Sequence, residues 1–313
     1  MNQDPTPNEE SASDASADRS GPQADQGGPM TVRFTPERFV RELWIDTALR
    51  RTVAVAAVLA IIGLALFEQA GASVNFLAVF GQVVSPLAFL VVILLVVGWI
   101  GVSTISANVW RALPAVTAMI ARNPDVAEDG LARLMKRRPL MRWVRLLLYH
   151  RLAAIRHRQH RFQESAAICR AVLSEPLGPA RRQRGSLLLM LAEASLQCRD
   201  MHGAYGALYE LHREKLGLAE RLQRLAIQTR YEVLNGHDRA ALGGLRDKLM
   251  LAELMPAEHC GAMHAMLTAS ARRVGRPELA DWLWRRSQLL CGPEKLDRLV
   301  RGAFAIGVVG PPE

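Results

Sequence analysis

The apolar residues of this chain are concentrated in one region and follow a helical period elsewhere. Between residues 52 and 110 the only charged residue is Glu68. This region contains two uncharged runs, 52–67 and 83–105, and about 20 apolar residues suffice for one helix to cross the hydrocarbon core of a bilayer. The first run is slightly short, but the arginines before it can reach the interface with their long side chains. We therefore predict a transmembrane helical hairpin, with a single hydrophobic hairpin buried inside a soluble protein as the alternative.

Two segments of different character precede this region. Residues 1–30 hold six acidic residues and one Arg, with almost nothing to bury, which predicts a disordered tail. After Thr35-Pro36, apolar residues recur at helical spacing, as expected of an amphipathic helix on the membrane surface with Trp44 near the head groups. A plain extension of the first membrane helix is the alternative for this segment.

Basic residues predict how the hairpin is oriented in the membrane. Five arginines lie between residues 31 and 51, and Arg111, Arg122 and Arg133 follow the second run, whereas the connector 68–82 has none. Because cytoplasmic flanks are enriched in Lys and Arg, both termini are expected in the cytoplasm.

From Asn123 onward the sequence predicts helices only. Leu, Ala, Arg and Glu dominate, runs of β-branched residues are absent, and turn-forming dipeptides containing Pro or Gly separate stretches of helical length. The fold class is therefore all-α, in six consecutive segments: a disordered acidic tail (1–34), an amphipathic juxtamembrane helix (35–51), the two-helix transmembrane hairpin (52–110), basic juxtamembrane helices (111–145), helical repeats (146–291), and a capping helix and tail (292–313).

Small residues recur in this helical region at a nearly constant interval. They stand at positions spaced by 39, 37 and 39 residues, namely Ser165, Ala204, Ala241 and Ala280. The first unit also has Tyr149, Leu152, Ala153, Cys169 and Pro176, and this spacing resembles a tetratricopeptide repeat (TPR). The resemblance implies an α-solenoid of about four helical hairpins. An irregular all-α bundle is the alternative, because two units carry Thr229 and Thr268 where the family has a small residue.

The layout of the whole chain is similar to that of HemY-type inner-membrane proteins. Two closely spaced spans precede helical repeats in both cases. The resemblance implies a location in the bacterial inner membrane. The acidic tail departs from the HemY layout.

Known catalytic and metal-binding motifs are missing from the sequence. It contains no phosphate-binding loop, dinucleotide fingerprint, metalloprotease motif or serine elbow. His157 and His160 are surrounded by arginines, which oppose a cation, and Cys260 and His264 could supply only two of four zinc ligands. The four cysteines are scattered and read as small buried side chains. We predict neither an enzyme nor a metal or cofactor site.

The distribution of charge indicates two candidate binding surfaces. Residues 111–185 hold sixteen basic and five acidic residues, and this segment is expected to contact anionic lipid. Aromatic residues for base stacking are scarce there, which disfavours nucleic acid. In stacked hairpins the first helices line a concave groove that binds peptides. The side chains expected to line it are His150, His157, Arg158, Glu193, Gln197, Arg230, Arg272 and Arg273.

These observations favour a membrane-anchored scaffold for protein–protein interaction. Its cytoplasmic repeats would recruit a partner protein or acidic peptide, since the expected groove is mainly positive. The alternative is an accessory subunit of a membrane enzyme or transport complex whose active site lies in a partner.

Overall fold

The computed structural model describes most of the chain from Phe76 onward. It covers residues 76–137, 139, 141–292, 294 and 296, and before them only 35, 39, 41, 44, 48, 51–56, 58 and 62. The acidic tail lies outside the described residues, as do most of the amphipathic helix, the first uncharged run and the capping helix.

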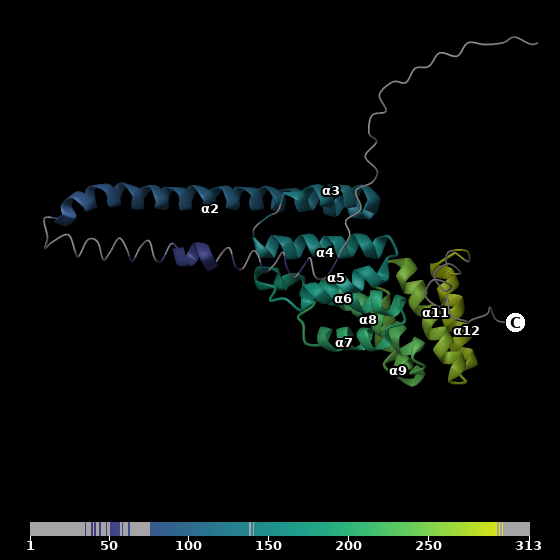
Figure 1. Cartoon of the computed structure of the whole chain (residues 1–313). Helices are drawn as coiled ribbons and strands as arrows, with labels where there is room; N and C mark the ends of the chain where they lie inside the picture. Colours follow the sequence, from purple (N-terminus) through teal and green to yellow (C-terminus); the bar gives the residue numbers. More distant parts are fainter. Residues whose placement is uncertain are drawn as a thin grey trace, which may run out of the picture.

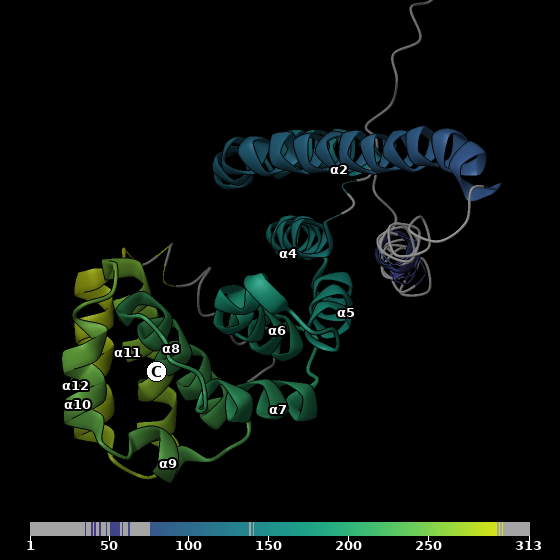
Figure 2. The ribbon, with the colours of Figure 1, turned by 90° about the vertical axis from the view of Figure 1, so that its left-hand side faces the viewer.

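The described residues are helical and include no strand, which confirms the all-α class at this level. Figures 1 and 2 show the helices in a curved succession from α2 through α4 and α6 to α11 and α12. The elements are α2 (Phe76–Arg122), α3 (Pro124–Lys136), α4 (Arg142–Arg158), α5 (Phe162–Leu173), the 3₁₀ helix η1 (Gly178–Gln183), α6 (Arg184–Gln197), α7 (Met201–Leu211), α8 (Leu218–Leu234), α9 (Asp238–Leu242), α10 (Leu245–Ala252), α11 (Ala257–Arg273) and α12 (Pro277–Leu290).

Helix α2 is longer at both ends than the sequence predicted. It begins at Phe76, inside the expected connector, and continues without interruption to Arg122, which gives it 47 residues. Pro86 therefore lies inside the helix and not in its first turn, where it removes one backbone hydrogen bond without ending the helix. Figure 1 shows the first part of α2 projecting beyond the other helices.

Among the residues that the structure describes, no helix combines the length and apolarity needed to cross a membrane. The structure thus gives the predicted transmembrane hairpin no support.

The second part of α2 packs with α3 and α4 and belongs to the core. One stripe of α2 is buried at helical spacing and consists of Ser106, Val109, Leu113, Val116 and Ile120. Asn123 and Pro124 separate α2 from α3: the Asn123 carboxamide accepts hydrogen bonds from the backbone N–H groups of Asp125 (3.1 Å) and Val126 (3.3 Å), and Pro124 occupies the first turn.

The same packing involves residues 111–145, for which the sequence predicted basic juxtamembrane helices. The apolar residues of that segment contribute to a helical pair, α2 with α3, that packs against the next pair.

Four further helical pairs follow, and the same turn ends the first helix of each. Each of these helices is followed by a residue in the left-handed backbone conformation, with φ between 59° and 76°. These residues are His160 after α4, Arg199 after α6, Gly236 after α8 and Gly275 after α11. In each case the next backbone N–H bonds to a carbonyl five residues earlier, at 2.8 or 2.9 Å. These positions are spaced by 39, 37 and 39 residues, which matches the spacing of the small residues.

The small residues lie where the two helices of each pair come together. Ser165, Ala204, Ala241 and Ala280 are all buried, with at most 1% of their surface exposed. The Ser165 hydroxyl donates to the Ala153 carbonyl at 3.0 Å, so the backbones of α4 and α5 approach closely at that point. The hairpin register read from the sequence is consistent with this burial.

The third pair departs from the expected pattern, because its second helix is broken in two. Helix α9 ends at Leu242 and α10 begins at Leu245, with Gly243 and Gly244 between them. Gly244 has φ +60°, a conformation that glycine adopts without the steric penalty of a side chain. The two adjacent glycines therefore account for the break.

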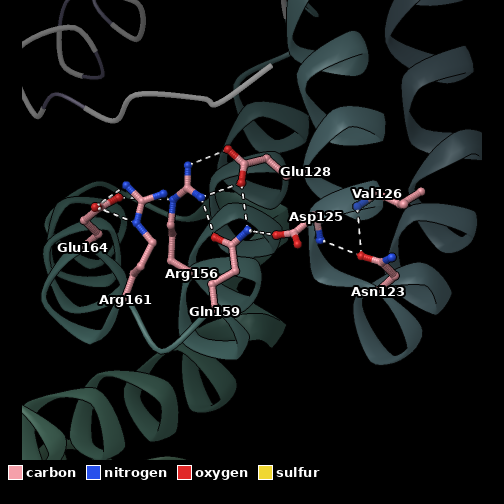
Figure 3. Close-up of polar contacts among 8 residues, drawn as sticks. All are labelled: Asn123, Asp125, Val126, Glu128, Arg156, Gln159, Arg161 and Glu164. Carbon is pink, nitrogen blue, oxygen red and sulfur yellow. Dashed lines mark hydrogen bonds and ion pairs between the residues drawn. The ribbon is translucent and has the colours of Figure 1, made fainter. Parts of the chain in front are cut away.

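A buried ion pair holds the α2/α3 pair against α4, as Figure 3 shows. Arg156 is fully buried, and its two terminal nitrogens bond to the Glu128 carboxylate of α3 at 2.6 and 2.7 Å. Gln159 bridges the same carboxylate and Asp125 at 2.9 and 2.8 Å. Glu164 of α5 approaches the Nε of Arg156 at 3.2 Å. Three helices thus share one network, which satisfies the charge of the buried guanidinium.

One described residue of the expected amphipathic helix contacts the helical pairs. Phe39 is buried with its ring 4.6 Å from that of Tyr149 on α4, in an edge-to-face arrangement. Protein therefore covers this ring, so at Phe39 the expected amphipathic helix contacts α4. Trp44 is exposed.

Candidate functional site

The polar side chains singled out from the sequence fall, with one exception, within the last two turns of the first helices. Each stands two, three or six residues before the left-handed residue that ends its helix. His157 and Arg272 stand at one equivalent position of this turn, and Glu193 and Arg230 at another. They come to the same end of successive helices, where the partial negative charge of a helix C-terminus favours basic side chains.

Three of these residues form a continuous row across α4, α6 and α8. The Nε2 of His157 lies 3.7 Å from a carboxylate oxygen of Glu193. Glu193 also interacts electrostatically with Arg230, one helix further on. One carboxylate thus lies between two groups that can carry positive charge, and all three side chains are at least partly buried.

Burial shifts the pKa of both basic groups in this row. It lowers the pKa of His157, an effect that Glu193 opposes and that Arg158 and His160 reinforce. It also lowers the pKa of the Arg230 guanidinium, again opposed by Glu193. Removal of water from these groups disfavours their charged forms, and the nearby Glu193 carboxylate favours them.

Arg272 occupies on α11 the position that His157 occupies on α4, three residues before the left-handed residue. Its guanidinium lies over the Trp284 ring, 6.0 Å from the ring centre. Its buried Nη2 has no hydrogen-bond partner among the described residues. The neighbouring Arg273 donates to the Val233 carbonyl at 2.8 Å, which places the end of α11 beside the end of α8. We refer to His157, Glu193, Arg230 and Arg272 as the polar row.

The remaining predicted site residues divide into two groups. Arg158 is exposed and Gln197 partly exposed, both at the edge of the polar row. Arg273 is bound within the protein, since its guanidinium forms a bidentate ion pair with Asp238 at 2.6–3.0 Å. Its assignment to a partner-binding surface therefore has a structural alternative, namely attachment of α9 to α11.

His150 is in the core, which argues against its predicted place in a groove. Only 2% of its surface is exposed, and its Nε2 lies 3.3 Å from the Ser186 hydroxyl of α6. Burial, followed by the charge of Arg151, lowers the pKa of His150 to about 4. The ring is thus a neutral packing residue between α4 and α6.

The candidate metal ligands have other roles in the structure. His264 is buried, and its Nδ1 bonds to the Cys260 carbonyl at 2.8 Å, so this nitrogen is engaged within the helix. His157 and His160 both meet the Phe162 ring edge to face. Within the described part of the chain no three potential ligands come together.

Two features near the site were missed at the sequence level. Arg151 is partly buried on α4, and burial lowers its pKa. Tyr205, Tyr209 and Tyr231 form a succession of rings 6.1–6.3 Å apart, with Arg213 over one of them. Tyr205 and Tyr209 stand four residues apart on α7, a spacing that the sequence shows, but Tyr231 belongs to α8, so its contact has no signal in local spacing.

Comparison with models of protein families, with curated proteins and with solved structures gave no match. The two resemblances described from the sequence therefore stay predictions, and function has to be argued from the geometry.

Proposed function

We propose that this protein is a membrane-anchored scaffold whose TPR-like repeats bind an acidic segment of a partner protein in the cytoplasm. The polar row carries the proposal. It presents two partly desolvated basic groups, His157 and Arg230, together with Arg272, near the C-terminal ends of first helices, and such groups form charge-assisted hydrogen bonds with carboxylates.

Arg272 is the strongest single contributor to this surface. Arg272 is only partly buried, and a guanidinium held over an indole ring is fixed in orientation, which favours a bidentate contact with a carboxylate. Charge-assisted hydrogen bonds of this kind contribute about 1.5–3 kcal/mol each, which is about a ten- to hundred-fold effect on affinity.

The exposed apolar surface of α2 supports the anchor. No charged residue occurs from residue 69 to residue 110. In the described part of α2 before the core stripe, the large apolar side chains are exposed; they are Leu90, Ile93, Leu94, Val96, Val97, Trp99, Ile100 and Ile105. Soluble monomers rarely expose so extensive an apolar surface, whereas lipid would cover it. On this proposal α2 continues from the bilayer into the first helical pair.

The proposal can be tested by site-specific photo-cross-linking in cells. A photoreactive amino acid at Gln197, beside the polar row, should capture a partner that mass spectrometry identifies. The same group at Gln288, on the exposed face of α12, serves as the control. The double substitution R230A/R272A should abolish the adduct at position 197.

Exposed Arg285 provides the matched control for these substitutions, and R285A should leave the adduct unchanged. The captured partner should contain an acidic segment, and a synthetic peptide of that segment should bind about ten-fold or more weakly to R272A. Identical adducts from both positions, or an adduct insensitive to R230A/R272A, would refute the polar row as the binding surface.

A further inference from the structure

A second charged surface lies at the opposite end of the helices from the polar row. It is formed by the last turn of α3, the first turn of α4 and η1. The Nε of Arg145 donates to the Pro139 carbonyl at 2.6 Å, which holds the α3–α4 connection against α4. Arg142 pairs with Glu175, and η1 packs on both α4 and α6. These three segments therefore form one contiguous surface.

The charge of this surface is positive because its acidic residues are already paired. Glu175 binds Arg142, and Arg184 binds both Glu210 (2.5 Å) and Glu214 (2.8 Å). Four other basic residues are exposed and form no ion pair with any residue that the structure describes: Lys136, Arg137, Arg181 and Arg182. We call these four residues the basic end.

Two tryptophans lie beside the basic end, at the point where α2 leaves the other helices. The rings of Trp110 and Trp143 are 5.0 Å apart, and Trp110 is 48% exposed. Trp110 is also the last residue of the uncharged stretch, and Arg111 follows it directly. Tryptophan beside arginine, at the limit of an apolar helix, is typical of the boundary between hydrocarbon and head groups.

The direction of α2 places the basic end near the level of these two tryptophans. Figure 1 shows the first part of α2 projecting past the end at which α4 begins, and Figure 2, in which α4 is seen end-on, shows that α2 crosses α4 at an angle. If the projecting part of α2 crosses the bilayer, the end of the helical pairs nearest the lipid is the one that carries η1 and the start of α4.

We propose that the basic end docks on anionic lipid head groups and fixes the orientation of the helical repeats on the membrane. This inference rests on the anchoring part of the proposed function, and it goes further by naming the lipid-facing surface and the lipid charge that this surface requires. Each basic residue near an anionic surface contributes about a five-fold factor to the docking equilibrium.

Hydrogen exchange of the full-length protein in lipid nanodiscs tests the docking. The amides of residues 174–184 should exchange more slowly in discs containing phosphatidylglycerol than in discs of phosphatidylcholine alone. In R181Q/R182Q the docking equilibrium, read from this protection, should weaken by about 25-fold. The difference between the lipids should vanish near 0.5 M salt, where screening shortens to a few ångströms.

The double variant R239Q/R246Q is the matched control, because it removes two exposed arginines from α9 and α10. It should retain the lipid-dependent protection. Equal exchange in the two lipids, or equal loss in both double variants, would overturn the docking while leaving the anchor intact. Extraction of the protein from membranes with alkaline carbonate is the separate test of the anchor. Release by carbonate would overturn the anchor, and the docking with it.

Discussion

At the scale of single residues, Arg156 has the smallest exposed surface of the arginines that the structure describes. Replacement by Ala leaves the Glu128 carboxylate buried without its partner, so R156A should lower the free energy of unfolding by about 3–5 kcal/mol. Chemical denaturation of the detergent-solubilised protein, followed by circular dichroism, measures this loss.

Arg161, five residues further along the chain and outside α4, offers a control. Its ion pair with Glu164 is solvent-exposed, and R161A should cost no more than about 1 kcal/mol. The double variant E128L/R156M should recover much of the stability lost in R156A, because it removes both charges together. Equal effects of R156A and R161A would contradict the buried network that joins α3, α4 and α5.

His150 makes stability depend on pH. Its pKa is about 4 in the folded protein, against 6.5 for an exposed imidazole. Between these pH values the unfolded chain binds a proton that the folded protein does not, so the stabilisation is complete above pH 6.5 and is lost as the pH falls towards 4. The loss attributable to this residue should be about 3 kcal/mol.

Comparing denaturation curves of the parent and H150Q isolates this effect, since glutamine does not titrate. The difference in unfolding free energy between pH 7 and pH 4 should be about 3 kcal/mol smaller in H150Q. The exposed His202 supplies the control variant, H202Q. A parent and an H150Q protein with the same pH dependence would show that the imidazole is not desolvated.

At the scale of elements, the repeated turn makes opposite predictions for two units. Arg199 adopts a left-handed conformation that costs a side chain about 1 kcal/mol, so R199G should raise the free energy of unfolding by up to that amount. Gly275 occupies the equivalent position in the last pair, and G275A should lower it similarly. Thermal or urea unfolding of the two variants provides the measurement. A loss of stability in R199G would show that the two turns are not equivalent.

The sequence was sufficient for the helical pairs but not for all of their boundaries. The small residues from Ser165 to Ala280 marked the close contacts, because only small side chains fit there. The pair formed by α2 and α3 was missed, since an uncharged run followed by arginines indicates a membrane flank whatever the second half of the helix contacts. Gly243-Gly244 breaks a helix that the period alone would continue.

The candidate site was predictable only in part, because the spacing of residues does not show which polar side chains are shielded from water. Spacing placed His157, Glu193, Arg230 and Arg272 on first helices, and the structure aligns them at one end. Spacing could not show that His150 is buried or that Arg273 is engaged by Asp238. Nor could it show that Arg156 lies in the core, because a charged residue in a sequence looks solvated until its partner is known. Those outcomes depend on contacts between residues far apart in the chain.

At the scale of the whole molecule, the two charged surfaces lie at opposite ends of the same helices. Helix α4 has 17 residues, which at 1.5 Å per residue is about 25 Å. The polar row is therefore held about that far from the basic end. With the basic end on a membrane, the row would meet partners beyond the layer of head groups.

Because α2 is uninterrupted, it also sets the rotational orientation of the helical pairs about its own axis. A helix turns by about 100° with each residue, so any residue added after Ile105 rotates everything that follows around the α2 axis. Two added alanines should rotate the polar row and the basic end by about 200°. Seven, close to two full turns, should restore the original orientation about 10 Å further along the axis. Cross-linking from Gln197 should then be lost and regained with the period of the helix, about 3.6 residues. Loss that grows steadily with the number of alanines would instead indicate that height alone matters.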